Sequence, residues 1–261
     1  METRLETLVT WPTERVFPER REQRDDPVVV EEPLSIFLQG EAWTVTMRSP
    51  GQDEALALGL LYSEGIIGSP DDVLAMEVDG GLRVTLREAP DLGAHRYSLA
   101  RNSACGLCGA QSVEQLARRW PPVRRRTQAT ETELMQAPEH LRQRQRVFQL
   151  TGGIHGASLG RVGASAPLAV TEDVGRHNAV DKLLGMALVK GWTEEPGLIL
   201  AVTSRVGFEI AAKAWALGVE YLVAVGAPTS LALETAVRAE ITVAGFATGN
   251  RMNLYCGRER L

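Results

Sequence analysis

The chain has 261 residues, of which 44% are hydrophobic, and its formal net charge is −5 at pH 7. A chain of this length can bury a sizeable core in one large domain or two smaller ones, and this hydrophobic fraction excludes wholesale disorder. The acidic balance gives no general attraction to nucleic acid or to anionic membranes, so we expect neither as a partner. Because we find neither an apolar run of the ~20 residues that span a bilayer nor a secretory leader, we expect a cytoplasmic protein.

The first part of the chain predicts a flexible arm over residues 1–26, followed by a small α+β domain over 27–120. Residues 19–26 contain no apolar side chain, which is typical of a frayed or loosely docked terminus. The elements predicted for the domain are a hairpin over 27–38 and 42–47, a helix over 53–63, and a second hairpin over 73–78 and 82–86. The second hairpin is well indicated because Asp79-Gly80 is a strong turn signal.

Reactive chemistry is concentrated in residues 101–110, where Cys105 and Cys108 form a Cys-x-x-Cys motif and each is followed by glycine. A short helix is predicted directly afterwards, and a thiol at a helix N-terminus is favoured as thiolate, the nucleophilic form. Two alternatives are half of a structural zinc site, which would need two more Cys or His ligands, and a structural disulfide, which is unusual inside cells. The third cysteine, Cys256, is given no role.

Residues 121–261 predict a layered α/β domain that begins after a Pro-broken basic segment over 120–127. The elements expected in it are a helical stretch over 131–149 divided at Pro138, strands over 157–159 and 167–170, and, after a strand end over 171–182 rich in carboxylates, a helix through residues 183–188 to Gly191. Strands over 198–202, 221–225 and 241–246, separated by helices over 207–217 and 231–238, are expected to follow. Apolar strands that alternate with helices indicate a mainly parallel sheet.

In such a sheet, ligands bind at the carboxyl ends of the strands, where helix N-termini also point. This places the loops over 203–205, 226–230 and 246–251 close together, and a large anionic ligand such as a nucleotide would fit them. Alternatively, the Ser and Thr side chains of these loops only cap the helices that follow them and bind no ligand.

His155 and His177, with Glu172 and Asp173, suggest acid–base chemistry or stabilisation of a thiolate. The alternative is a hydrogen-bonded histidine that fixes a turn at the start of a helix, which we favour for His177.

Together these motifs resemble the FdhD/NarQ family of formate dehydrogenase accessory sulfurtransferases. The resemblance runs from about residue 28 to the C-terminus. The matching stretches, in chain order, are Ala104-Cys-Gly-Leu-Cys-Gly109, Thr151-Gly-Gly-Ile-His155, Glu172-Asp-Val-Gly-Arg-His-Asn-Ala-Val-Asp-Lys182, Ser204-Arg205 with Glu209 and Lys213, Ala227-Pro-Thr-Ser-Leu-Ala232, and Gly245-Phe246 through Asn253-Leu-Tyr255. The resemblance implies two domains, of which the second has a cytidine-deaminase-like three-layer α/β fold.

The same resemblance implies that the protein carries persulfide sulfur from a cysteine desulfurase to the molybdenum cofactor bis-molybdopterin guanine dinucleotide (bis-MGD), which formate dehydrogenase requires. It implies that the protein acts as a homodimer. The persulfide would form on Cys105, with Cys108 as helper or alternative acceptor. The family's cofactor-binding segment corresponds to Phe246, Ala247, Thr248, Gly249, Asn250 and Arg251. Thr248 stands where relatives tend to have a basic residue, so Arg251 is the only cation of this segment.

Three other functions compete with sulfur transfer. A zinc nucleobase deaminase would need His-x-Glu and Pro-Cys-x-x-Cys motifs. Ala104 precedes Cys105, and none of the histidines is followed two positions later by glutamate, so we reject deamination and expect no structural metal. A non-enzymatic chaperone that binds bis-MGD and docks it onto apo-formate dehydrogenase remains open. A thiol-disulfide oxidoreductase is less favoured because no thioredoxin-like βαβ context surrounds the cysteines.

Overall fold

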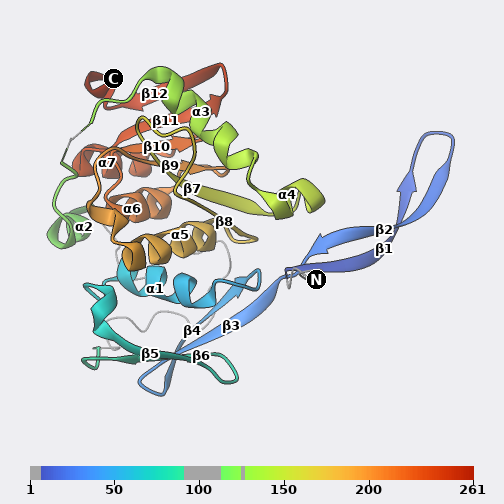
Figure 1. The fold of residues 1–261 in the computed structure, drawn as a ribbon, viewed down its shortest axis with the longest axis horizontal. Coiled ribbons are helices and arrows are strands. Elements are labelled where there is room, and N and C mark those ends of the chain that lie inside the picture. Colours follow the sequence, from blue (N-terminus) through green and yellow to red (C-terminus); the bar gives the residue numbers. More distant parts are fainter. Residues whose placement is uncertain (1–6, 91–112, 125–126) are drawn as a thin grey trace.

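The computed structural model of the chain describes residues 7–90, 113–124 and 127–261 (Figure 1). It contains a two-stranded, a four-stranded and a six-stranded sheet, together with helices that separate and cover the two larger sheets. The predicted fold class, a mixed α and β protein with a layered α/β C-terminal part, is confirmed. The segment with Cys105 and Cys108 lies outside the described residues.

Residues 8–29 form a regular antiparallel hairpin of β1 (Leu8–Val16) and β2 (Arg21–Val29), where we predicted a frayed arm. Figure 1 shows this hairpin extending away from the body of the protein. Polar cross-strand contacts hold it, because the Arg21 guanidinium and the Gln23 amide both donate to the Glu14 carboxylate, at 2.9 and 3.0 Å. A ribbon with solvent on both faces needs no apolar alternation, so the usual sequence signal of a strand was missing.

The two predicted N-terminal hairpins are confirmed and share one sheet, in the order β4-β3-β6-β5, except that residues 27–29 belong to β2 and the first strand begins at Glu32. The strands are β3 (Glu32–Leu38), β4 (Glu41–Arg48), β5 (Val73–Val78) and β6 (Leu82–Leu86). Parallel pairing of β3 with β6 joins the hairpins. The helix α1 (Asp53–Glu64) lies beside this sheet and ends at Gly65, whose φ of 72° is the left-handed conformation that glycine adopts easily.

The six-stranded sheet has the order β12-β11-β10-β9-β7-β8. Its strands are β7 (His155–Arg161), β8 (Ala169–Asp173), β9 (Leu198–Val202), β10 (Tyr221–Ala224), β11 (Thr242–Thr248) and β12 (Arg251–Cys256). Only β9, β10 and β11 pair in parallel; β7, β8 and β12 add to the sheet in antiparallel fashion. The prediction of a mainly parallel sheet therefore holds for its centre. β12 was missed because it is a half-exposed edge strand.

Helices cover both faces of this sheet (Figure 1). On one side lie α5 (Arg176–Lys190), α6 (Phe208–Leu217) and α7 (Ser230–Ala239), with α2 (Val113–Arg119) against α7. On the other side lies α3 (Glu131–Arg142), followed by the short α4 (Arg146–Thr151). Short 3₁₀ helices cover Pro70–Asp72, Trp192–Glu194 and Arg258–Arg260.

The predicted division of the 131–149 helix at Pro138 is wrong. Proline lacks the N–H that would complete one helical hydrogen bond, but Pro138 lies on the buried face of α3 with Leu134 and Leu141. Packing of this face against the sheet compensates for the lost bond. The helix ends instead at Arg142, and the chain turns through residues 143–145 into α4.

The two halves of the protein meet where α1 crosses α5, and glycines allow a very close approach there. A Cβ atom on Gly185 would come within 1.9 Å of the Ala55 carbonyl oxygen, and one on Gly59 within 2.0 Å of the Asp181 carbonyl oxygen. A continuous hydrophobic core runs through this contact and across residue 120, where we placed the boundary between two domains. The division into two domains stays a prediction. In the described part of the chain, no helix has the length and apolar character that a membrane span requires.

Candidate functional site

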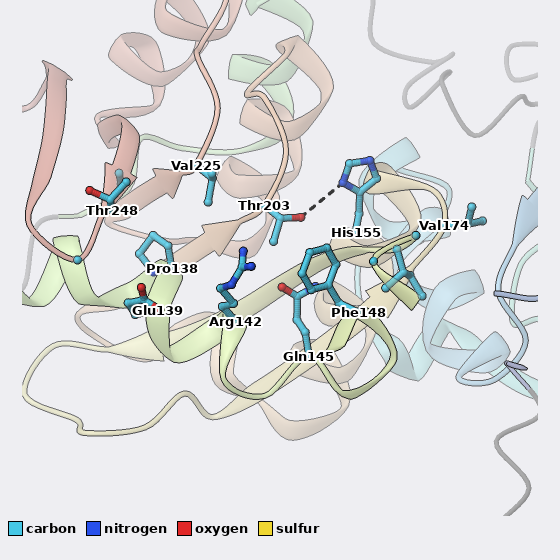
Figure 2. A pocket seen from close by; sticks show the side chains of 15 residues that line it. Pro138, Glu139, Arg142, Gln145, Phe148, His155, Val174, Thr203, Val225 and Thr248 are labelled. Atoms are coloured by element: carbon cyan, nitrogen blue, oxygen red, sulfur yellow. Dashed lines mark hydrogen bonds between the residues drawn. The ribbon is translucent and has the colours of Figure 1, made fainter. Parts of the chain in front are cut away.

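A pocket of about 410 Å³ opens at the carboxyl ends of the three parallel strands (Figure 2). Thr203 follows β9, Val225 follows β10, and residues 247–249 come from the end of β11 and the turn after it. The opposite wall is formed by the end of α3, by α4 and by the glycine-rich turn over 152–153 that leads into β7. This is the position that the sequence predicted for a ligand.

Backbone hydrogen bonds hold the predicted loops together at this edge. Phe246 N donates to the Gly226 carbonyl at 3.2 Å, and Gly226 N donates to the Ser204 carbonyl at 3.3 Å. Gly226 must be small, because a Cβ there would lie 2.9 Å from the Arg205 Cα. The loops over 203–205, 226–230 and 246–251 therefore do meet, as their places after neighbouring strands predicted.

The predicted cofactor-binding segment is divided by the geometry of the β11–β12 turn. Ala247, Thr248 and Gly249 line the pocket, whereas Phe246, Asn250 and Arg251 are not part of its lining. A β-bulge gives Phe246 a φ of 51° and leaves its side chain 45% exposed. Thr248 Oγ1 contacts Asn250 Oδ1 at 2.9 Å within the turn. The cofactor-binding role of these six residues stays a prediction.

The cation of the pocket lining is Arg142, the last residue of α3. Its guanidinium carbon lies 5.1 Å from the centre of the Phe148 ring. Figure 2 shows the guanidinium pointing from the helix into the pocket, between Gln145 and Pro138 and toward Thr203. Among the described residues, no carboxylate lies within ion-pair distance of it. Arg142 was not predicted as a site residue, because nothing in the local sequence distinguishes it from the nearby Arg144 and Arg146.

His155 begins β7 and points toward the end of β9. Its Nδ1 lies 3.5 Å from Thr203 Oγ1, and which of the two groups donates depends on the tautomer (Figure 2). Burial lowers the pKa of His155, and the charge of Arg176 lowers it further, while Asp173 acts in the opposite direction. The imidazole is therefore neutral at neutral pH. It can accept a proton or a hydrogen bond in the pocket, but it adds no positive charge there.

Gln145 is a buried polar side chain of the pocket lining, 1% exposed. Its Nε2 has no hydrogen-bond partner among the described residues. The side chain packs closely on Gly156, where a Cβ would approach Nε2 to 2.4 Å. A buried amide without an acceptor costs about 1–3 kcal/mol, so native proteins keep such a group where a ligand or water completes it.

The carboxylates Glu172 and Asp173 of the 172–182 motif lie outside the pocket lining and hold the elements around it. Glu172 accepts from the backbone N–H groups of Val147 and Phe148, at 3.0 and 2.9 Å, and so caps α4. Asp173 pairs with Lys182 at 2.7 Å, and both side chains are fully buried. These positions indicate that Glu172 and Asp173 stabilise the fold and do not take part in catalysis.

His177 is likewise buried, in the first turn of α5, with its Nε2 4.0 Å from the Glu209 carboxylate. It is not part of the pocket lining. The helix-start position is the one that we favoured for it from the sequence.

The described part of the chain also bears on metal and thiol chemistry. No group of three or more His, Cys, Asp or Glu side chains there is arranged to hold a metal ion. Cys256, the cysteine that the structure describes, lies in β12 outside the pocket lining and points to the Ile241 carbonyl at 3.3 Å. Burial raises the pKa of its thiol, so Cys256 is a poor nucleophile.

A concave pocket at the carboxyl ends of parallel strands, lined by a guanidinium, the Glu139 carboxylate, hydroxyl groups and glycine backbone, is typical of α/β proteins that bind a small polar ligand. The sequence model of the FdhD/NarQ family matches residues 29–261. The chain belongs to this family.

The similar proteins extend over nearly the whole chain. A protein of Streptomyces avermitilis named "Sulfur carrier protein FdhD" is 42% identical over 259 residues, which cover 91% of this chain and 90% of that protein. A protein of Nocardia farcinica with the same name is 41% identical and covers 95% of this chain, with 92% of its own length matched. The crystal structure of a formate dehydrogenase accessory protein from Desulfotalea psychrophila matches with a TM-score of 0.76 at 21% identity, over 98% of this chain and 99% of that one, and supports the fold.

Proposed function

We propose that the protein is a sulfur carrier for formate dehydrogenase, which takes sulfur from a cysteine desulfurase and delivers it to bis-MGD. The names of its relatives support the sulfur-carrier role and a role in formate dehydrogenase maturation. The structural observation that carries the proposal is the pocket at the strand ends, into which Ala247, Thr248 and Gly249 project from the predicted cofactor-binding segment. We expect the protein to act as a homodimer.

The residues of the pocket fit one nucleotide end of bis-MGD as the bound substrate. A volume of about 410 Å³ lies at the lower end of the range for small-ligand pockets, so the pocket suits one arm of this large molecule. Arg142 offers a charge to a phosphate, and Gln145 and Thr203 offer polar groups to the rest of a nucleotide. Bound bis-MGD would supply the molybdenum centre that takes the sulfur.

In the proposed first step, the Cys105 thiolate attacks the terminal sulfur of the persulfide on the desulfurase. The S–S bond of the donor breaks, the donor cysteine leaves as thiolate, and a new S–S bond forms on Cys105. Delivery would break this S–S bond, with its electron pair kept by Cys105 as thiolate, while the acceptor supplies the electron pair of the new bond to the transferred sulfur. Cys108 is the helper or the alternative acceptor.

Mass spectrometry of the protein after incubation with a cysteine desulfurase and cysteine tests this step. We expect a gain of one sulfur, about 32 Da, on Cys105. The gain should be lost in Cys105→Ala, and Cys108→Ala shows whether Cys108 takes part. Cys256 is an internal control, because its raised thiol pKa should leave it unmodified. A Cys105 that stays unmodified would contradict the proposal.

The second candidate is a chaperone that binds bis-MGD and docks it onto apo-formate dehydrogenase. One observation favours it: the described lining of the pocket contains no cysteine, so binding alone would need only this pocket. The two functions differ in Cys105→Ala. A chaperone with this substitution would still activate formate dehydrogenase in cells that lack the native protein, whereas a sulfur carrier would not.

A further inference from the structure

The β1–β2 hairpin, residues 8–29 and here called the arm, has one exposed apolar face. Val9 pairs with Val28 and Trp11 pairs with Asp26 across the two strands. Because side chains alternate between the faces of a strand, Val9, Trp11 and Val28 lie together on one face. Their exposed fractions are 43%, 60% and 40%. A two-stranded ribbon is only marginally stable in water, and clustered exposed apolar side chains mark an interaction surface, so we expect this face to be covered by another surface.

The base of the arm is fixed, and the arm extends away from the body of its own chain (Figure 1). Arg48, 6% exposed, donates to the carboxylate of Glu32 at 2.6 Å and to that of Asp53 at 2.9 Å, and so holds the strand that follows the arm. A hollow of about 310 Å³ stays open between the arm and the turn over 151–153. Thr13 and Val28, which share the face of Trp11, line this hollow. The apolar face therefore borders a space that a second molecule can enter.

A second uncovered apolar surface is a groove of about 520 Å³ between α1, α5 and β5. Its lining includes the apolar side chains Leu58, Val73, Met76, Met186 and Val189. Val189 is 66% exposed, and Leu74 and Val78 of β5 are 58% and 81% exposed. β5 is also an edge strand, and such edges are usually protected by several charges or by proline, whereas Glu77 is the only charge within β5. The groove and the strand beside it therefore form a surface that is suited to a protein partner.

We propose that the arm of one copy of this chain fills the groove of a second copy, with Trp11 as the anchor. Each chain has one such arm and one such groove, so a two-fold symmetric pair that exchanges arms covers all four surfaces and closes. The groove volume is in the range that holds a drug-sized molecule, and it therefore takes an indole ring with its apolar neighbours. Tryptophan is also among the side chains that contribute most to the centre of interfaces. This inference rests on the homodimer expected for the proposed function, and it names the surfaces that form that dimer.

The charges of the two surfaces favour a second copy as the partner. The groove lining carries Glu54 and Lys190, one charge of each sign. Beside Trp11, the arm carries Arg24 and Asp26, which form an ion pair with each other. Two copies therefore meet without repulsion between net charges, and burial of apolar side chains stabilises the contact. Neither surface offers the excess of positive charge that attracts a nucleic acid or an anionic membrane.

Sedimentation velocity of the full chain over a range of concentrations tests the exchange. Trp11→Ser and Val189→Glu should each raise the dissociation constant of the dimer by about tenfold or more. Both side chains are more than half exposed in the single chain, so each variant should keep the far-UV circular dichroism of the unmodified protein. Val16→Ser is the matched control for the arm, because Val16 is 61% exposed but lies on its other face. Val237→Glu is the control for the groove, since Val237 is 61% exposed on α7 outside the groove lining, and both controls should dimerise like the unmodified protein.

Photocrosslinking identifies the surface that the arm contacts. With p-benzoylphenylalanine in place of Trp11, irradiation should give a crosslinked dimer, and peptide mapping should place the crosslink within residues 54–58, 73–78 or 186–190. A dimer whose dissociation constant is unchanged in Trp11→Ser and Val189→Glu, or a crosslink outside these residues, would overturn the arm exchange and leave the homodimer standing. A chain that stays monomeric at all concentrations would contradict both. Sulfur transfer is tested separately, as added mass on Cys105.

Discussion

Replacement of Lys182 by methionine tests whether the 172–182 motif is a structural frame. Lys182 Nζ lies 2.7 Å from Asp173 Oδ2 and donates to the Ser49 carbonyl at 2.9 Å, and it is 1% exposed. Methionine has a similar length and shape but no charge, so the substitution removes the ammonium group and leaves the packing nearly unchanged. The Asp173 carboxylate then stays buried without its cation.

The size of the effect follows from what remains around Asp173. Removal of one partner of a buried ion pair costs about 3–5 kcal/mol, because the other charge is left uncompensated. Three N–H donors still reach the carboxylate, from Ser49 N at 3.2 Å, Gly175 N at 2.8 Å and the Asn178 side chain at 3.1 Å. We therefore expect the lower part of this range, about 3–4 kcal/mol. For a protein of this size the thermal midpoint would fall by roughly 6–16 °C.

Thermal unfolding followed by circular dichroism measures this effect. Lys190→Met is the control, because Lys190 lies exposed at the end of the same helix and should cost at most about 1 kcal/mol. The Asp173→Asn/Lys182→Met double variant should cost less than the sum of its two single variants, since the pair is coupled. A midpoint for Lys182→Met within about 2 °C of the unmodified protein, or strictly additive variants, would refute the structural reading of the motif.

Two other predictions concern the helix crossing and the pocket. Gly185→Ala should lower the free energy of unfolding, measured in urea, by about 1–3 kcal/mol or more, because its Cβ would lie 1.9 Å from the Ala55 carbonyl oxygen. Gly160→Ala is the control and should lower the free energy of unfolding much less, because its Cβ would have only ordinary contacts at 3.8 Å. Equal losses of stability in the two variants would contradict the close approach of the helices as the cause. The His155 imidazole should titrate in NMR below its usual pKa of about 6.5, mainly because it is buried. Its contribution to stability is therefore full above pH 6.5 and is lost as the pH falls through the lowered pKa. Arg176→Gln should raise the pKa of His155, and an unchanged titration would contradict the contribution of the Arg176 charge.

Much of the fold could be predicted because its signals are local. The Asp79-Gly80 turn and the left-handed Gly65 mark element ends within a few residues, and both were confirmed. Elements determined by tertiary packing were harder to predict. Pro138 continues a helix because its face is buried, and β12 exists because β11 offers it an edge, so neither could be inferred from residues near it in the sequence.

The candidate site could likewise be predicted only where it depends on the order of neighbouring strands. The topology of neighbouring strands predicted that Thr203 and residues 247–249 would meet, and they do. Arg142 and Gln145 reach the same pocket only because α3 packs across the sheet and α4 turns back toward β7. Nothing in the local sequence distinguishes Arg142 from Arg144, which lies two residues further on and outside the lining.

The 172–182 motif connects these observations, although its described carboxylates are not part of the pocket lining. Glu172 fixes the start of α4, α4 presents the Phe148 ring, and that ring positions the Arg142 guanidinium. Asp173, the next residue, is held by Lys182, which also binds the Ser49 carbonyl beyond the end of β4. The same short segment therefore orders the ligand pocket and attaches the six-stranded sheet to the N-terminal half. A substitution at Glu172 should consequently disturb phosphate recognition through Arg142, even though Glu172 itself would never touch the ligand.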